Sequence, residues 1–358
     1  MKKILISLKE DGKNGGPFNS HLRIMMSSLA EKYEFVPLLI PKGRLRLINP
    51  KLTMNLIRQI RYHRPDLVHF AGMELIGFHV ALACKLSGQK NTLMAIHGSA
   101  SESLALKRTI FKGKFLTLLE YLTVKWTKYC YGVSDYVSGW SRVRAFPGHC
   151  FGTIYNIVAL GGNELQLKND IRQELGIASN KIVAVTIGRI EVEKGFDVLR
   201  EVIKNDTNVE LVYLIVGEGA YLAEMKGHLK LQEAEGKVYF LGYRADVTHI
   251  LQGSDIFVTA SYHETLCMAL AEAGLNGLAL IAAKVGGMPE IIVHEECGFL
   301  IPSHNPCDYN EKIDNLVKNK ALLSEMKRRA KLLVGEKFKI ESIESKLDSV
   351  YQHIFLKS

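Results

Sequence analysis

Short apolar segments alternate with helix-length segments along the whole chain, and this pattern constrains the fold more than any other feature. The apolar segments are KKILISL (2–8), EFVPLLI (34–40), PDLVHFAG (65–72), NTLMAIHGSAS (91–101), KIVAVTIGRI (181–190), VELVYLIVGEG (209–219) and GKVYFLGY (236–243). Each has the length of a strand, and a segment of helical length follows it. This order is typical of parallel α/β sheets. The sequence therefore predicts an α/β fold.

The length of the chain and one break in the pattern predict two domains. At 358 residues the chain is long for a single hydrophobic core. Between Asn156 and Glu164 the alternation is interrupted by V-A-L-G-G-N-E, which fits an interdomain linker. The same alternation then begins again. We expect one domain over residues 1–160 and a second over residues 161–341.

The charge is distributed unevenly between the two halves. Residues 1–150 hold 23 Lys and Arg against 9 Asp and Glu, a balance of +14, whereas the remainder has a balance of −5. A basic first half indicates an anionic partner such as lipid headgroups or a phosphorylated acceptor. Zinc-finger spacing, RNP-type sequence and stacked aromatic residues are missing from the sequence, so we expect no nucleic-acid partner.

Cysteine usage and hydropathy predict a cytoplasmic location. The six cysteines have no C-x-x-C spacing and no zinc pattern, which is typical of reduced, mostly buried thiols. The apolar N-terminal run ILISL is too short for a signal peptide, and no run reaches the length of a membrane span.

The segment from Leu104 to Tyr129 combines apolar and aromatic side chains with six basic residues and one acidic residue, Glu120. Such a composition fits a basic amphipathic surface that binds anionic lipid. A core helix with a solvated basic face fits it equally well, so peripheral binding to the inner face of the membrane stays one of two expectations.

The stretch from Ser261 to Ile292 carries two glutamates eight residues apart. The sequence predicts a loop that delivers Glu264 to the start of a helix on which Glu272 lies. At about 1.5 Å rise per residue the carboxylates would be roughly 12 Å apart along the axis. A glycosidase pair is closer, at roughly 5 to 9.5 Å. The spacing suits two contacts on one elongated ligand, with helix N–H groups between them for a phosphate. The alternative is an ordinary amphipathic helix with two surface glutamates.

Glycine turns and basic residues follow several of the predicted strands. Gly15 and Gly16 lie between the first strand and its helix, where close approach to a ligand and a plain tight turn are both reasonable. Arg189 and Lys194 surround a second strand-to-helix turn and could together neutralise a diphosphate. The sequence contains no Asp-x-Asp, His-x-x-x-His or carboxylate cluster, so we expect no metal and no cofactor.

Four histidines of the first half divide into one candidate for the site and three structural residues. His97 stands at the carboxyl end of the fourth strand, which is where open α/β sheets bind ligands. His69 ends the third strand and is interpreted as a buried residue with satisfied hydrogen bonds. His63 and His79 lie on predicted helices and receive a structural interpretation.

Several motifs of the second half occur in a fixed order between residues 188 and 292. They are G-R-I-E-V-E-K-G (188–195), V-G-E-G (216–219), F-L-G-Y-R (240–244), E-x7-E (264–272), N-G-L-A-L-I (276–281) and G-G-M-P-E-I-I (286–292). In order and spacing they resemble the retaining glycosyltransferases of family 4. The first half matches more loosely, through Gly15-Gly16 and segments 65–69, 97–99, 133–134 and 155–156. The resemblance implies the GT-B fold, with two Rossmann-like domains whose parallel sheets face each other across a cleft. A C-terminal helix at about 342–358 would return to the first domain.

The resemblance also implies roles for individual residues. The donor site would consist of Gly15, Gly16, Arg189, Lys194, Arg244, Glu264, Leu266, Cys267, Met268 and Glu272. Arg189 and Lys194 would bind the donor diphosphate, and Glu272 the ribose hydroxyls. Glu264 would lie beside the donor sugar, and His97 would face the sugar and the acceptor. His97, Glu264, Arg189 and Lys194 are therefore the expected catalytic residues.

Other implied contacts come from the backbone. The N–H groups of residues 266–268 would hold sugar hydroxyls or the β-phosphate, and the chain near Arg244 would lie at the edge of the base. The family usually has E-G-F-G where this chain has E-T-L-C. Thr265 and Cys267 thus replace glycines, which leaves the identity of the donor sugar open.

The implied function is retaining transfer of a hexose-type sugar from a nucleotide diphosphate sugar, with UDP as the expected nucleotide. The acceptor would be a saccharide or a lipid-linked saccharide of bacterial surface polysaccharide synthesis, and 1–160 would be the acceptor domain. A non-catalytic GT-B partner subunit and a sugar-nucleotide epimerase are the alternatives. Such subunits commonly lose one of the Arg, Lys or Glu residues, all of which are present here, and the usual epimerase pattern lacks E-x7-E.

Overall fold

The computed structural model describes residues 1–10, 16–41, 48–99, 110–158 and 171–357. The chain divides into two compact units, the first formed by Met1–Val158 with Phe338–Ser358 and the second by Ala159–Lys337. Each unit contains a six-stranded sheet whose strand pairs are all parallel. The predicted α/β class is confirmed. Acceptor and donor roles for 1–160 and 161–341 stay predictions, and the proposed linker lies partly outside the described residues.

The sheet of the first unit has the order β2-β1-β3-β4-β5-β6. Its strands are β1 (Lys2–Lys9), β2 (Tyr33–Ile40), β3 (Leu67–Ala71), β4 (Thr92–Ile96), β5 (Tyr129–Gly132) and β6 (His149–Thr153). Every residue of β3, β4 and β5 is buried. Because helices cover both faces of such a sheet, these strands are continuous apolar runs and do not alternate with polar residues.

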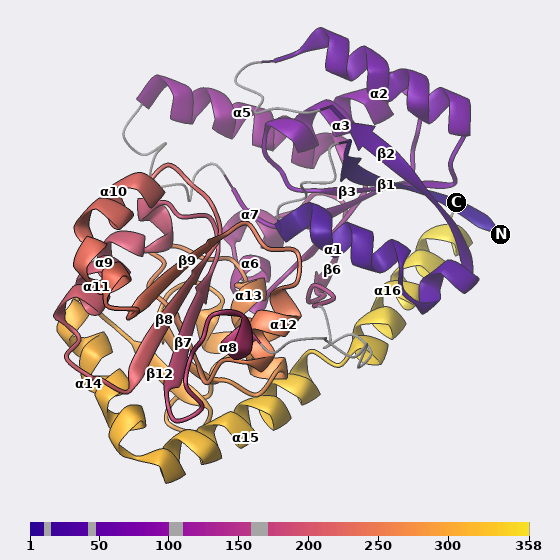
Figure 1. Ribbon diagram of the computed structural model, residues 1–358. Helices are drawn as coiled ribbons and strands as arrows, with labels where there is room; N and C mark the ends of the chain where they lie inside the picture. The colour runs from indigo at the N-terminus through magenta and orange to yellow at the C-terminus, as the bar shows by residue number, and fades with distance from the viewer. Residues whose placement is uncertain (11–15, 42–47, 100–109, 159–170, 358) are drawn as a thin grey trace. The chain divides into compact units, whose positions relative to one another are not determined.

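Helices cover both faces of this sheet (Figure 1). They are α1 (Gly16–Met25), α2 (Pro50–His63), α3 (Leu75–Ser87), α5 (Ile110–Trp126), α6 (Asp135–Ser138), α7 (Ser141–Arg144) and α16 (Ile340–Leu356), with a short 3-10 helix at Ser28–Glu31. The start of α2 is specified by Asn49, whose side chain accepts from the N–H of Leu52, and by Pro50 in its first turn. At its end α3 has Gly88 in the left-handed conformation (φ 78°).

The C-terminal helix α16 is part of the first unit and is held there by polar contacts with residues far away in the sequence. Asp348 accepts from the Tyr33 hydroxyl at 2.6 Å and pairs with Lys32 at 2.7 Å. The Tyr351 hydroxyl is 2.9 Å from Nδ1 of His69 on β3. These contacts and the rings of Tyr33 and Tyr351, 5.2 Å apart, anchor the helix on the sheet.

The sheet of the second unit has the order β12-β11-β10-β7-β8-β9. Its strands are β7 (Ile182–Ile187), β8 (Leu211–Val216), β9 (Val238–Gly242), β10 (Ile256–Thr259), β11 (Ala279–Ala283) and β12 (Gly298–Ile301). The helices are α8 (Ile171–Glu174), α9 (Phe196–Asn205), α10 (Leu222–His228), α11 (Lys230–Ala234), α12 (Val247–Gln252), α13 (Met268–Leu275), α14 (Pro306–Lys318) and α15 (Lys320–Lys337). Two 3-10 helices span Val192–Lys194 and Met288–Glu290.

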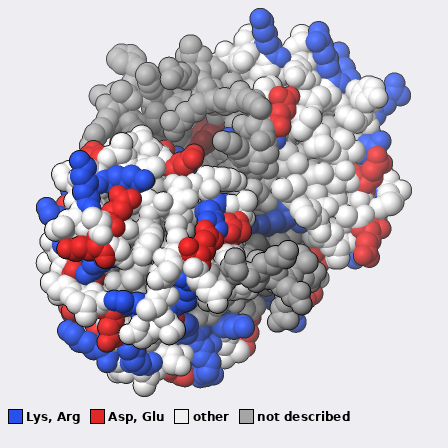
Figure 2. Space-filling view, in the orientation of Figure 1, with Lys and Arg blue, Asp and Glu red and all other residues white. Residues whose placement is uncertain are grey.

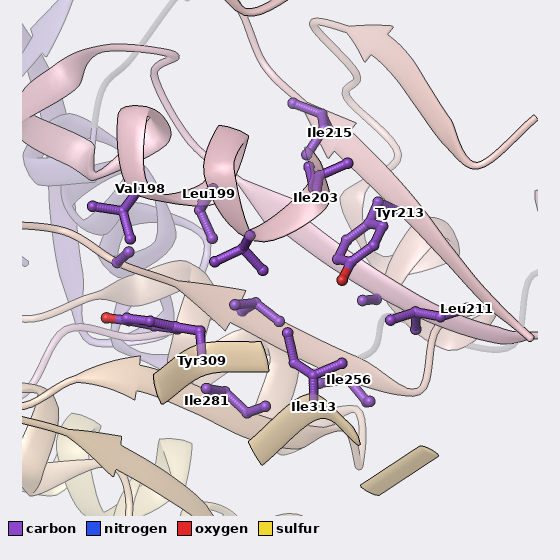
Figure 3. Close-up of a cluster of buried hydrophobic side chains, with 14 of the residues drawn as sticks. Val198, Leu199, Ile203, Leu211, Tyr213, Ile215, Ile256, Ile281, Tyr309 and Ile313 are labelled. Atoms are coloured by element: carbon purple, nitrogen blue, oxygen red, sulfur yellow. The ribbon is translucent and has the colours of Figure 1, made fainter. Parts of the chain in front are cut away.

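A large apolar core lies between this sheet and helices α9 and α14 (Figure 3). From α9, Leu199 and Ile203 point toward the strands, and from α14, Ile313 does the same. On α9 the apolar residues recur every three or four positions, so one face of the helix is buried. On the other face of the sheet, α13 packs against α15 so closely that a Cβ at Gly274 would lie 2.7 Å from Val334.

Basic side chains are prominent over α2. Figure 2 shows Lys and Arg side chains projecting over α2, whereas positive and negative side chains are interspersed on the second unit. The sequence of α2 contains no Asp or Glu. Among the described residues, no helix combines the length and hydropathy that crossing a membrane requires.

Candidate functional site

The carboxyl edge of the second sheet gathers four of the motifs found in the sequence. Because the strands are parallel, the turns after β7, β8, β10 and β11 all lie at this edge, the position at which open α/β sheets bind ligands. Backbone hydrogen bonds join the turns to one another. The N–H of Ile190 donates to the carbonyl of Glu218 at 2.9 Å, and the N–H of Tyr262 donates to the carbonyl of Glu193 at 3.1 Å. The turns therefore form one continuous surface.

Two glycines allow these turns to approach closely. Gly195 (φ 72°) directly follows Lys194, and a Cβ there would lie 2.0 Å from the carbonyl oxygen of Ala260. Gly286 (φ 53°) lies after β11, and a Cβ there would lie 1.6 Å from the carbonyl oxygen of Glu264. Any side chain at either position would push the turn after β10 away from its neighbours. The glycines of the 188–195 and 286–292 motifs thus fix the backbone on both sides of residues 260–264.

Lys194 and Glu264 form an ion pair at the centre of this surface. The ammonium nitrogen is 2.6 Å from Oε1 of Glu264, and the two side chains are 23% and 13% exposed. Burial alone would lower the pKa of Lys194, but the Glu264 carboxylate outweighs this effect and the pKa is raised. The ion pair therefore keeps a positive charge in place beneath the surface of the turn.

The helix that follows begins later than the sequence predicts. Its first residue is Met268, with Cys267 at the N-cap, so Glu264 lies in a loop and not in the first helical turn. The Glu264 carbonyl accepts from the N–H of Gly287 at 3.1 Å, and this bond together with the pair to Lys194 holds the residue in the loop. The predicted axial separation of about 12 Å from Glu272 rests on helical rise from residue 264 onward, and residues 264–267 are not helical.

The N-terminus of α13 nevertheless lies between the two glutamates, as predicted. Glu272 is buried on the helix, 9% exposed, and is one turn after its start. Leu266 and Cys267 are buried at 6% and 7% exposure. Burial raises the pKa of Cys267 to about 12, so its thiol is protonated at neutral pH. The first N–H groups of an α-helix have no carbonyl partner within the helix, so the N-terminus of α13 is suited to an anion or a hydroxyl.

Arg189 and Arg244 are both at this edge but are engaged by carboxylates. Arg189 donates to Glu191 at 2.8 Å, and its side chain is 57% exposed. Its positive charge is near enough to Lys194 to oppose the raised pKa of that lysine. Arg244 pairs with Glu174 and Asp246, each at 2.6 Å. An exposed pair such as that of Arg189 contributes little stability, so a phosphate could displace Glu191 readily.

A group behind the ion pair was not predicted from the sequence. Tyr262 donates to Asp197 at 2.8 Å, and its ring stacks on His304 at 4.3 Å between centroids. His304 Nε2 is 3.2 Å from the Ser261 carbonyl oxygen. Together these contacts fix the turn that carries Glu264. Tyr262 and Ser261 belong to the stretch singled out in the sequence, but Asp197 and His304 are too distant along the chain for a local pattern to connect them.

In the first unit, His97 lies at the carboxyl end of β4, as predicted. Two residues after His97, the Ser99 hydroxyl donates to Glu120 at 2.8 Å, and Arg142 pairs with the same carboxylate at 2.5 Å. Glu120 is 1% exposed. The single acidic residue of the basic 104–129 segment therefore anchors the turn after β4, a role that its sequence neighbourhood does not reveal.

Three histidine rings lie together beneath this turn. The His21 ring is 4.6 Å from His69 and 6.3 Å from His97, between centroids. Burial lowers the pKa of His21 to about 4 and that of His97 to about 3, and it lowers the pKa of His69 as well. All three are neutral at pH 7. A neutral His97 suits the exchange of hydrogen bonds with a hydroxyl.

The structural interpretations of His69 and His79 are confirmed, whereas that of His63, at the end of α2, stays a prediction. His69 is fully buried, and its ring nitrogens lie 2.9 Å and 3.0 Å from the hydroxyls of Tyr351 and Tyr131. His79 lies on α3, 2.7 Å from the Thr53 hydroxyl. Of the two glycines predicted after β1, Gly16 is the first residue of α1, and Gly15 lies outside the described residues.

No metal centre competes with this edge in the part of the chain that the structure describes. That part contains no cluster of three His, Cys, Asp or Glu residues suited to a metal ion. A hollow of about 580 Å³ lies at the opposite, amino edge of the second sheet, lined among others by Lys181, Asp206 and Lys237. None of the predicted donor residues lines it. We place the candidate site at the carboxyl edge because the motifs and the partly buried Lys194–Glu264 ion pair are there.

Comparisons with known proteins match the second unit to a family model and the whole chain to solved structures. The model described as "Glycosyl transferases group 1" matches residues 168–333. The chain is 28% identical to N-acetyl-alpha-D-glucosaminyl L-malate synthase of Bacillus anthracis over 212 residues, 58% of this chain and 55% of that enzyme. The chain thus spans little more than half the length of that relative.

A second relative matches over nearly the whole chain. UDP-Gal:alpha-D-GlcNAc-diphosphoundecaprenol alpha-1,3-galactosyltransferase of Escherichia coli is 25% identical over 354 residues, 95% of this chain and 87% of that enzyme. Among solved structures, Anabaena Alr3699/HepE in complex with UDP-glucose superposes with a TM-score of 0.82 at 18% identity, covering 99% of this chain and 100% of that chain. At this identity the likeness shows the fold alone.

Proposed function

Because residues 168–333 are a glycosyl transferases group 1 domain and the chain has the GT-B fold, we propose that this protein is a glycosyltransferase. It takes a hexose-type sugar from a nucleotide diphosphate sugar and transfers it to a saccharide or lipid-linked acceptor. The observation that carries the proposal is the partly buried Lys194–Glu264 ion pair beside the N-terminus of α13. A fixed cation and helix N–H groups are what a leaving diphosphate requires.

In the proposed reaction the second unit stabilises the diphosphate as its charge develops. Lys194 supplies a preorganised cation, Arg189 leaves Glu191 to bind the phosphate, and the N–H groups at residues 266–268 complete the site. Glu272 binds the ribose, and the chain near Arg244 edges the base. We propose retention of configuration by front-face attack, with the leaving phosphate as proton acceptor, so that no protein nucleophile is needed. Metal independence is part of the proposal, since these protein groups carry the positive charge.

In this proposal His97 contacts the donor sugar and the acceptor hydroxyl. Its pKa is lowered to about 3 by burial, which supports a role as a neutral hydrogen-bonding group. The Glu120–Ser99 hydrogen bond would keep the turn after β4 in position. Gly16 at the start of α1 would allow the backbone to approach the phosphate.

The nucleotide and the acceptor are proposed from the longer relative. The E. coli enzyme acts, by its name, with UDP-Gal on a diphosphoundecaprenol-linked sugar. We propose UDP as the nucleotide and a lipid-linked saccharide of bacterial surface polysaccharide synthesis as the acceptor. The donor sugar is left open by Thr265 and Cys267, both of which occupy family glycine positions.

Such an acceptor would place the protein on the inner face of the membrane. Helix α5 exposes Phe115 (44%), Leu118 (52%) and Tyr121 (59%), next to Lys114 and Lys125. Apolar side chains among lysines suit an anionic lipid surface. Co-sedimentation with anionic liposomes at low salt tests this part, and a Phe115→Glu/Leu118→Glu variant should remain in the supernatant. The proposed membrane binding is refuted if the wild type and the variant sediment equally, or if neither protein sediments with the liposomes.

The function as a whole is tested with a panel of nucleotide sugars. A bound donor raises the melting temperature by mass action, so the cognate nucleotide sugar should give the largest shift. That donor and a lipid-linked acceptor should then yield a glycosylated product and free nucleotide diphosphate. Turnover to an epimeric sugar nucleotide would identify an epimerase, and the lack of any shift or turnover would indicate a non-catalytic subunit.

A further inference from the structure

Two cysteines occupy paired positions on neighbouring strands of the first sheet. Cys130 lies on β5 and Cys150 on β6, and they are register partners in the parallel ladder. Neighbouring strands lie about 4.8 Å apart. A disulfide bond joins Cα atoms that are roughly 4.4 to 6.8 Å apart. A register shift between Cys130 and Gly132 interrupts the ladder beside the pair, so the strands have room for a local adjustment.

Both sulfurs lie on the same face of the sheet. The flanking residues Tyr129 and Phe151 have their rings 5.9 Å apart, and both contact His353 of α16. Because side chains alternate along a strand, Cys130 and Cys150 both point to the face of the sheet opposite α16. The pairing in the ladder therefore brings the two thiols together.

The two thiols differ in exposure and acidity, as an attacking and a resolving cysteine do. Cys130 is completely buried, whereas Cys150 is partly exposed because β6 is the edge strand. A hydrogen bond with Cys130 lowers the pKa of Cys150, and the same interaction together with burial raises the pKa of Cys130. Cys150 is thus the thiol that ionises first and that a solute can reach.

The remaining cysteines lack this arrangement. Cys84, Cys267 and Cys297 are buried, and burial raises the pKa of each. Cys307 is exposed near the start of α14, in the other unit. All six cysteines are in the described part of the chain and all are free thiols. Only the pair on β5 and β6 combines a partly exposed cysteine with a second cysteine as its register partner.

We propose that Cys130 and Cys150 are an oxidative modification site, which a hydroperoxide converts to an interstrand disulfide linking β5 to β6. The Cys150 thiolate attacks one peroxide oxygen, the O–O bond breaks, and the released alkoxide or hydroxide takes a proton and leaves. The resulting Cys150 sulfenic acid is attacked by the sulfur of Cys130. The S–O bond breaks, and the hydroxide takes the Cys130 proton to form water. The two thiols lose two electrons, and the peroxide gains them.

The proposal is independent of the glycosyltransferase function, because neither cysteine belongs to the donor site. Its consequence is mechanical. The disulfide closes the chain between β5 and β6, so it fastens the edge strand to the sheet and raises the melting temperature of the protein. Edge strands fray more easily than central ones, and the reduced form is expected to lose β6 first on heating.

Mass spectrometry of the full-length protein tests the proposal. The protein is treated with hydrogen peroxide, denatured and alkylated, and the expected result is a fall from six alkylated cysteines to four, reversed by dithiothreitol. Trypsin releases the two cysteines on separate peptides, residues 129–142 and 145–168, so the disulfide is detected as a linked pair. The proposal is overturned if both peptides stay unlinked with free thiols, or if Cys150 is oxidised to the sulfinic acid while Cys130 remains free.

Variants sharpen the test. Cys150→Ser should keep all five of its thiols after peroxide treatment and should show no rise in melting temperature. The matched control Cys84→Ser removes a buried cysteine outside the pair and should still lose two thiols. A Cys150→Ser protein that loses two thiols, or a Cys84→Ser protein that loses none, would contradict the assignment. If either variant fails to fold, the presence or absence of the disulfide-linked peptide pair in the wild-type protein decides whether the disulfide forms.

Discussion

Charged residues at the candidate site and in the turn after β4 are held in pairs, and each partner keeps the other in position. Lys194 keeps its positive charge because Glu264 is 2.6 Å away, and Glu264 stays in its loop partly because of Lys194. In the first unit the Glu120 carboxylate is buried between the Ser99 hydroxyl and Arg142. Removing one member of such a pair leaves the other buried without its partner, which costs more than the pair contributes.

Glu120→Gln tests the anchoring of the turn that carries His97. The amide keeps the shape of the side chain but loses the charge that Arg142 and Ser99 bind, so we expect a loss of about 1–3 kcal/mol in the free energy of unfolding. Arg142 is 41% exposed and can reach water, which keeps the loss below that of a fully buried pair. Urea unfolding measures the change.

Glu34→Gln is the matched control for this substitution. Glu34 also pairs with a basic residue, Lys3 at 3.3 Å, but its side chain is half exposed. Its substitution should change the free energy of unfolding by no more than about 0.5 kcal/mol. If both variants unfold like the wild type, Glu120 does not hold the turn.

At the scale of elements, the site depends on turns that touch backbone to backbone. The turn after β11 passes so close to the loop after β10 that only glycine fits at position 286. The start of α13 at Met268, four residues after Glu264, follows from the same contact. A change in one turn should therefore alter the position of residues that lie far from it in the sequence.

Gly286→Ala is expected to disrupt the proposed donor site while leaving the core of the second unit folded. The new methyl group would overlap the Glu264 carbonyl, and alanine is strained at φ 53°. We expect a lower melting temperature and at least tenfold weaker nucleotide binding, measured by calorimetry. Gly335→Ala in α15 is the control, since its methyl group meets nothing within 4 Å and helix propensity improves. Wild-type nucleotide binding by the Gly286 variant would show that the contact is not needed.

At the scale of the whole molecule, buried histidines make the first unit sensitive to acid. His21 and His69 have folded-state pKa values below the ordinary 6.5, so the unfolded chain binds more protons as the pH falls below 6.5. The free energy of unfolding therefore has its full value above pH 6.5 and decreases as the pH falls toward 4. Each of the two histidines should lower the free energy of unfolding by about 1.4 kcal/mol when the pH falls from 7.5 to 5.5.

Urea unfolding at the two pH values checks this expectation. The wild type should lose stability on acidification, and His21→Gln should lose less, because one of the groups that must stay neutral has been removed. Equal losses in the two proteins would mean that His21 does not contribute to the acid sensitivity.

The sequence predicts the layout of the molecule better than the partners of its side chains. Apolar runs such as LVHFA and TLMAI predict central strands because burial on both faces requires them, and both are strands. The Tyr351–His69 hydrogen bond joins residues 282 positions apart, and Arg244 meets Glu174 across 70. Nothing local specifies such contacts. The start of α13 escapes local prediction for the same reason, since the Gly287–Glu264 hydrogen bond that holds residue 264 in the loop comes from another turn.

We propose that the carboxyl edge of the second sheet binds a nucleotide diphosphate sugar through Lys194 and Arg189. Calorimetric titration of UDP, followed by transfer assays with the cognate donor, tests it on Lys194→Ala, Arg189→Ala and the control Lys181→Ala. Lys181 lines the hollow at the opposite edge of the same sheet, so its loss should leave binding and transfer unchanged. We predict that the first two variants fold, bind UDP at least tenfold more weakly and lose about 10²–10³ in transfer rate. Wild-type binding and turnover by both, or loss of binding in Lys181→Ala alone, would contradict the assignment.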